Sequence, residues 1–216
     1  MCWNQYVSLN TFIFSAFVLL LIVYNNKYSP YKIEELNNIY AYFFLMSFIT
    51  MQLIEFFLWR NLNDKELNKL FSILGALLIM LQPIASLMLL KDIKVRNIML
   101  MFYVIPAFSY IIYNINSKDF FTSVSKFGHL KWNWVEFKGN NQILFIFWLF
   151  FLFFSIFYNK YYLGLAYTIF LLIITLYSYI KDGTFGSLWC WSINSLMLFY
   201  AIKLLVIIPY KEHGMC

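Results

Sequence analysis

Charged residues and the side chains of acid–base and metal chemistry are scarce in this sequence. Asp, Glu, Lys and Arg make up 12% of its 216 residues, against about 25% in soluble globular proteins. The only histidines are His129 and His213, and neither they nor any aspartate fall within a long apolar segment. The sequence therefore excludes a bis-histidine haem or multi-histidine metal site inside a membrane, an intramembrane aspartyl protease and Ser-His hydrolysis there. It also lacks a Walker loop, which excludes ATP hydrolysis.

Cysteine is scarce too, with only Cys2, Cys190 and Cys216, and no two of them form a CxxC pair. That spacing disfavours a zinc ribbon or a dithiol redox site, and we expect no metal and no cofactor. The first apolar run has neither a basic segment before it nor a small-residue cleavage site, so we expect it to remain as a membrane span. The net charge is +6, but the basic residues lie in short loops between apolar runs. There they fit lipid headgroups better than nucleic acid.

Long hydrophobic runs dominate what is present, since 62% of the residues are hydrophobic and the mean hydropathy is +0.70. A membrane-spanning helix needs about 20 mostly apolar residues, and seven segments qualify. They are residues 7–24, 37–58, 70–90, 97–115, 142–158, 161–180 and 187–208. The sequence thus predicts an all-α, multi-pass integral membrane protein, with one bundle of about seven transmembrane helices over residues 1–216. Lys and Arg are divided equally between the two faces that such a bundle would have, so orientation is not predicted.

One connection, residues 116–141, is much longer than the others. Its middle alternates polar and apolar residues around Trp132 and Trp134, a pattern that indicates a short strand or hairpin lying on the membrane. Tryptophan prefers the membrane–water interface, so both side chains are predicted to be interface anchors. The alternative is that this loop is a lid over a site on the same face of the bundle.

Glu55 is the only carboxylate within a predicted span. Gln52 lies three residues before it, on the same face of the helix. Because an ionisable group is costly inside a membrane, Glu55 is a candidate proton or cation site. The alternative is that Glu55 lies near enough to the headgroups to be hydrated, where Arg60 could pair with it.

Other polar residues interrupt the apolar spans. Gln82 precedes Pro83, and a proline frees a backbone carbonyl one turn earlier and bends the helix. Gln82 is then expected either to cap such a carbonyl or to contact a solute. Trp191 and Asn194 share a face of the last span, where they either line a path or join helices by hydrogen bonds. Topology brings the polar residues of the first, second and last spans to one end of the bundle.

The motifs Gln52-x-x-Glu55-x-x-x-Trp59, Leu81-Gln82-Pro83 and Gly186-Ser187-x-Trp189-Cys190-Trp191 make the chain similar to a family of small multi-span membrane proteins of large DNA viruses and protists. That family is uncharacterised, so the resemblance implies no activity and no catalytic residue.

Three functions stay open from the residues. The first is a small transporter or channel for an ion or small solute, with Glu55 as the binding group and Gln52, Gln82, Trp191 and Asn194 lining the path. The second is a non-catalytic membrane protein that binds lipid or organises a partner. The third is a lipid-modifying enzyme, which one carboxylate without an intramembrane histidine supports least. A cavity reaching Glu55 would favour the first.

Overall fold

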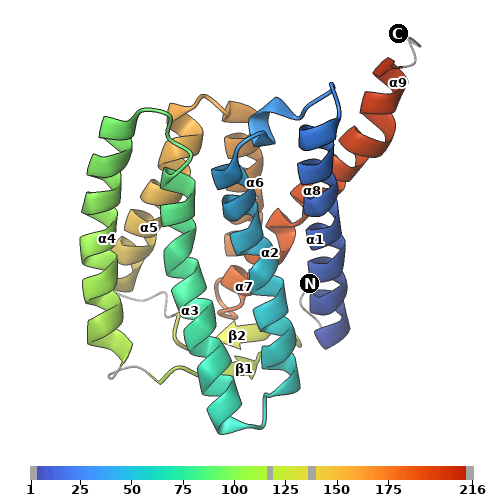
Figure 1. Cartoon of the computed structure of the whole chain (residues 1–216). Coiled ribbons are helices and arrows are strands. Elements are labelled where there is room, and N and C mark those ends of the chain that lie inside the picture. Colours follow the sequence, from blue (N-terminus) through green and yellow to red (C-terminus); the bar gives the residue numbers. More distant parts are fainter. Residues whose placement is uncertain (1–3, 116–118, 136–139, 213–216) are drawn as a thin grey trace.

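A computed structural model describes residues 4–115, 119–135 and 140–212 of the chain and is all-helical apart from one small hairpin (Figure 1). The helices are α1 (Gln5–Tyr28), α2 (Ile39–Arg60), α3 (Lys65–Leu87), α4 (Ile93–Ile115), α5 (Asn140–Tyr158), α6 (Tyr162–Tyr179), α7 (Phe185–Ile193), α8 (Ser195–Ile202) and α9 (Ile208–Glu212). A 3-10 turn, η1 (Glu34–Leu36), precedes α2, and a π-helical turn, η2 (Lys203–Ile207), joins α8 to α9. The first and last described residues lie near opposite ends of the bundle (Figure 1).

Six helices of the described residues are long and apolar enough to cross a membrane, taking α7 to α9 as one continuous rod. The remaining predicted span, residues 142–158, corresponds to the helix Gln142–Tyr158, which is apolar but shorter than the other six. Large apolar side chains cover the outside of the bundle, and Leu163 and Tyr177 are among the most exposed. The all-helical character that the sequence predicts is therefore confirmed, and the six helices of spanning length in the described residues are compatible with a multi-pass membrane protein.

Short polar side chains set where the helices begin. Asp64 accepts hydrogen bonds from the backbone N–H groups of Glu66 and Leu67 at the start of α3. Asn4, Asn38 and Asp92 do the same for α1, α2 and α4. These caps satisfy donors that the first turn of a helix leaves unpaired, so each of these four helices begins directly after an Asn or Asp.

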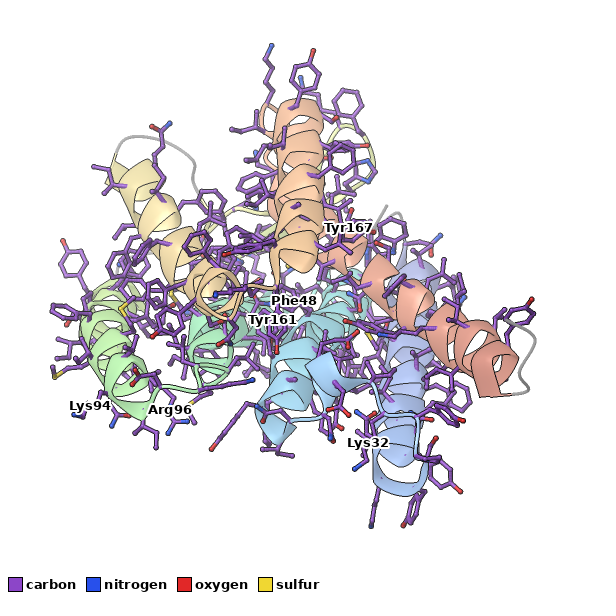
Figure 2. All side chains as sticks on the ribbon, turned by 90° about the horizontal axis from the view of Figure 1, so that it is seen from above. Lys32, Phe48, Lys94, Arg96, Tyr161 and Tyr167 are labelled. Carbon is purple, nitrogen blue, oxygen red and sulfur yellow. The ribbon has the colours of Figure 1, made fainter. Side chains whose placement is uncertain are left out.

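The buried residues form two main cores. The α1–α2–α8 core contains Ile22, Ile49 and Met197, and is closed at one end by Ile33 before η1. The second core lies between α3, α4, α5 and α7, with Leu87, Tyr103 and Leu152 at its centre. Seen from above, Phe48 lies in the middle of the bundle, while Lys94 and Arg96 extend from α4 at its edge (Figure 2). Helix α4 packs mainly on α3, and this peripheral position bears on the site described below.

The long loop contains the hairpin, made of β1 (Thr122–Val124) and β2 (Leu130–Trp132), which pair antiparallel with Thr122 opposite Trp132. The short hairpin predicted for this loop is thus confirmed. It lies at the lower end of the bundle in Figure 1, with β1 against α3 and β2 beside α7. The ends of the loop, residues 116–118 and 136–139, lie outside the described residues.

Candidate functional site

A buried asparagine on α3 holds the hairpin in place. The Asn68 side chain donates to the Thr122 carbonyl oxygen at 2.9 Å and accepts from the Thr122 backbone N–H at 2.8 Å. The Ser72 and Thr122 hydroxyls add a third hydrogen bond at 2.8 Å. Asn68, Ser72 and Thr122 are all fully buried. Because Asn68 pairs with both backbone groups of one strand residue, it fixes the position of the hairpin against the helices.

The hairpin covers a cavity of about 170 Å³. Its walls are formed by α3, α4, α5 and α7. On the side of the hairpin, the cavity is closed by the side chains of Phe120, Trp132 and Trp134. The lining is almost entirely apolar and aromatic and includes no Asp, Glu, Lys, Arg or His among the described residues. Leu77 and Leu144, both at least one third exposed, belong to the lining as well, so the cavity reaches the outer apolar surface of the bundle.

The proline in α3 explains part of the wall. Pro83 has no N–H, which leaves the carbonyl of Ile79 without its helical partner. The Trp148 indole of α5 donates to that carbonyl at 2.9 Å. The Tyr103 hydroxyl of α4 donates to the next carbonyl, that of Met80, also at 2.9 Å. Side chains of two neighbouring helices therefore donate hydrogen bonds to the backbone carbonyls one turn before Pro83. Gln82 was predicted either to cap such a carbonyl or to contact a solute, and the structure does not show the capping.

Gln82 instead faces α7. It is fully buried, lines the cavity and interacts with the thiol of Cys190, while no group among the described residues lies at full hydrogen-bonding geometry to its amide nitrogen or oxygen. A buried amide left in this state costs about 1–3 kcal/mol.

Trp132 and Trp134 are two further lining residues with a polar atom that lacks a hydrogen-bond partner among the described residues. Their rings stack nearly parallel, with centroids 5.3 Å apart, and they are only 3% and 9% exposed. Neither indole N–H has a hydrogen-bond acceptor among the described residues. The structure buries both side chains beside the cavity, and their role as interface anchors, like the alternative of a lid, stays a prediction.

The position of the Trp132 ring follows from Gly186 at the start of α7. A Cβ atom added to Gly186 would lie 2.9 Å from Cζ3 and 3.2 Å from Cε3 of Trp132. The benzo edge of the Trp132 indole thus lies against Gly186. The edge that carries Nε1 is on the opposite side of the ring and is turned away from this glycine. A side chain at position 186 would push the indole out of this position.

Glu55 and Gln52 form a second buried polar group on α2, next to the cavity but not among the residues that line it. Both are fully buried, and the Gln52 amide donates to Glu55 Oε2 at 3.2 Å. Cys190 lies close enough to interact electrostatically with Glu55 while it contacts Gln82. Cys190 is a buried free thiol, and Cys2 lies outside the described residues. Glu55 is therefore buried inside the protein, not hydrated near the surface.

The two predicted residues of the last span have other contacts. Trp191 is directed to α1, where its indole donates to the Thr11 hydroxyl at 3.1 Å. The Asn194 amide donates to the Cys190 carbonyl one turn earlier, at 2.9 Å. The structure thus brings together Gln52, Glu55 and Gln82 around Cys190, and it places Trp191 and Asn194 in contacts between and within helices.

Sequence reasoning missed most of the cavity wall. It also missed Asn68, which holds the hairpin but does not line the cavity. Trp148, Tyr103 and Asn68 stand in ordinary positions along the apolar runs and loops, and no local pattern marks them. The one available signal was Pro83, because a freed carbonyl requires a donor from another helix. Burial lowers the pKa of His129, which precedes β2, below its usual value, and the carboxylate of Asp182 opposes this shift only in part.

No family model, no curated protein and no solved structure matches this chain. The resemblance to viral and protist membrane proteins stays a prediction, and function must be argued from the site itself.

Proposed function

We propose that this protein spans a membrane seven times and binds a lipid-like molecule in the aromatic cavity beneath the hairpin. The observation that carries this proposal is an uncharged, aromatic cavity that reaches the apolar outer surface of the bundle. A lipid can enter such a cavity sideways without leaving the hydrocarbon region. Pockets for small molecules are mostly apolar with a few polar groups, and this one has that character.

The size of the cavity limits what it holds. Its volume of about 170 Å³ is close to that of an engineered apolar cavity of ~150 Å³ that binds benzene. It therefore accommodates one end of a chain or a single small ring, with the rest of the molecule in the bilayer. A whole phospholipid does not fit inside.

The test is photo-crosslinking in reconstituted vesicles with a long-chain ester that carries a diazirine in its chain. Mass spectrometry locates the labelled residues, and we expect labels on Trp132, Trp134 and α7 residues of the cavity wall. Ala107→Phe fills the cavity from α4 and should reduce this labelling roughly fivefold, the effect of about 1 kcal/mol. Ile112→Phe, on the exposed face of the same helix, is the matched control and should leave it unchanged. Uniform labelling of outer surfaces, unaffected by Ala107→Phe, would refute the proposal.

A second candidate is transport of a proton or cation through Glu55. It is supported by the complete burial of this carboxylate with Gln52 and by the proximity of Gln82 and Cys190. The test is flux into vesicles loaded with a pH-sensitive dye, under an imposed H⁺ or K⁺ gradient. Flux that falls in Glu55→Gln would support transport. The absence of flux above empty vesicles, with folded protein, would count against an H⁺ or K⁺ pathway.

A further inference from the structure

Several polar side chains in the cavity wall already have partners within the protein. The Trp148 indole and the Tyr103 hydroxyl donate to backbone carbonyls of α3 at 2.9 Å. The Trp189 indole donates to a backbone carbonyl of α6 at 3.4 Å, and the Asn114 amide donates to a carbonyl of its own helix at 2.8 Å. These four side chains therefore serve the contacts between and within the helices.

Three other polar side chains of the wall are enclosed by their neighbours. The indole nitrogens of Trp132 and Trp134 and both polar atoms of the Gln82 amide have almost no accessible surface. A molecule in the cavity therefore does not reach these atoms. No charged side chain lines the cavity within the described residues, so the surface that the cavity offers to a ligand is almost entirely aliphatic and aromatic carbon.

Such a wall selects against the polar end of a lipid. A carbonyl or hydroxyl group that entered the cavity would lose its hydrogen bonds to water without gaining a partner, and an ionised headgroup would lose more. A hydrocarbon chain has no such loss, and it gains close contacts with wall atoms that otherwise border empty space. The cavity also reaches the outer apolar surface at Leu77 and Leu144, which in a membrane is covered by lipid chains.

We infer that the cavity takes the methyl end of a lipid chain and leaves the headgroup outside the protein. Its volume of about 170 Å³ is close to that of the apolar cavity of ~150 Å³ that holds benzene, so about six carbons of the chain enter. Selection then depends on the size of the chain end and not on the headgroup. This inference rests on the proposed lipid binding and specifies which part of the lipid is recognised.

The first experiment compares two long-chain esters in reconstituted vesicles, one with the diazirine near the methyl end and one with it beside the ester group. Tyr110 lines the cavity, whereas Tyr113 on the same helix is 78% exposed, so the two residues offer the probe the same side chain. We expect the ratio of Tyr110 to Tyr113 labelling to be at least fivefold higher with the methyl-end probe. An equal ratio, or a higher one with the ester-end probe, would overturn the inference and leave lipid binding intact. Labelling of Tyr110 by neither probe would overturn both.

Competition against the methyl-end probe separates the headgroup from the chain end. Methyl palmitate, palmitate and hexadecyltrimethylammonium share a straight sixteen-carbon chain and differ in headgroup charge, and we expect them to compete within threefold of one another. Two isomeric esters carry an adamantyl cage, either at the methyl end or beside the ester group. The first should compete at least tenfold more weakly than the second, because the cage does not fit. The reverse order, or a tenfold dependence on the headgroup, would overturn the inference.

Two variants test whether the cavity itself is responsible. Ala107→Phe fills the cavity from α4 and should bring both probes to the same ratio of Tyr110 to Tyr113 labelling. Ile112→Phe adds the same ring on the exposed face of that helix and should leave the difference between the probes unchanged. A folded Ala107→Phe protein that keeps the full difference would overturn the inference. The comparison of the two probes in the wild-type protein stands even if this variant fails to fold.

Discussion

Two buried primary amides in this bundle, Asn26 and Gln82, have very different surroundings. Asn26, in the α1–α2–α8 core, accepts from the Ile33 N–H at 2.8 Å and donates to the Tyr42 hydroxyl at 3.0 Å and to the Ile33 carbonyl at 3.4 Å. Among the described residues, the side chain of Gln82, at the cavity, interacts only with the thiol of Cys190. In the closed core the polar groups are satisfied by the chain itself. At the cavity wall the amide of Gln82 has only the thiol of Cys190 as a partner among the described residues.

The largest expected effect comes from releasing the hairpin. Asn68→Ala removes both hydrogen bonds to the Thr122 backbone and leaves that buried N–H and carbonyl unpaired. We expect a loss of about 2–4 kcal/mol in the free energy of unfolding. Thermal unfolding in detergent, followed by tryptophan emission, measures it.

The control for this change is Asn61→Ala. Asn61 makes a single hydrogen bond to the Phe57 carbonyl at 2.7 Å and is only half-buried, so the expected loss is about 0.5–1.5 kcal/mol. Equal losses in the two variants would show that the hairpin is not clamped by Asn68.

Replacing each of the two amides with leucine tests the comparison directly. Asn26→Leu leaves the Ile33 N–H and carbonyl without partners and should cost about 1–3 kcal/mol. Gln82→Leu removes an amide that makes few hydrogen bonds in the folded protein. The free energy of unfolding should therefore change by less than ~0.5 kcal/mol or increase. Chemical denaturation with one shared detergent measures both. A larger loss for Gln82→Leu than for Asn26→Leu would mean that Gln82 is satisfied within the protein.

Enlarging a buried alanine to leucine should lower stability in the α1–α2–α8 core and raise it at the cavity. Ala41 is buried in the α1–α2–α8 core and Ala107 lines the cavity. Ala41→Leu overpacks a filled core and should destabilise the protein by about 1–3 kcal/mol. Ala107→Leu fills empty space and should stabilise it by about 0.5–1 kcal/mol. Melting temperatures that fall together would indicate that the cavity has no room for a side chain.

The smallest effects concern two glycines. Gly186→Ala places a Cβ against the Trp132 ring, and we expect a cost of about 1 kcal/mol with a shift in tryptophan emission. Gly164→Ala meets nothing within 4 Å near the start of α6, so lower backbone entropy of the unfolded chain should raise stability by about 0.5 kcal/mol. An unchanged emission spectrum in Gly186→Ala would argue against a fixed Trp132.

Much of the architecture could be predicted because it depends on local pattern. Apolar runs of about twenty residues specify helices, and Asn or Asp residues in the intervening loops cap them. The alternation around Lys131 predicts the hairpin, and the spacing of Gln52 and Glu55 predicts their contact on one helix face. The site could not be predicted this way, since its key contacts join Asn68 to Thr122 and Trp148 to Ile79, across 54 and 69 residues.

The sequence by itself determined that the chain is helical and apolar enough to cross a membrane repeatedly, because hydropathy and periodicity act within each segment. It also determined which polar groups must be accommodated: Glu55, Gln82 and the carbonyl freed by Pro83. Only the tertiary structure decided which of them are satisfied. Trp148 and Tyr103 reach the backbone carbonyls one turn before Pro83, whereas Trp132, Trp134 and Gln82 border a cavity. The cavity remains because α4 lies at the edge of the bundle, and the hairpin closes it.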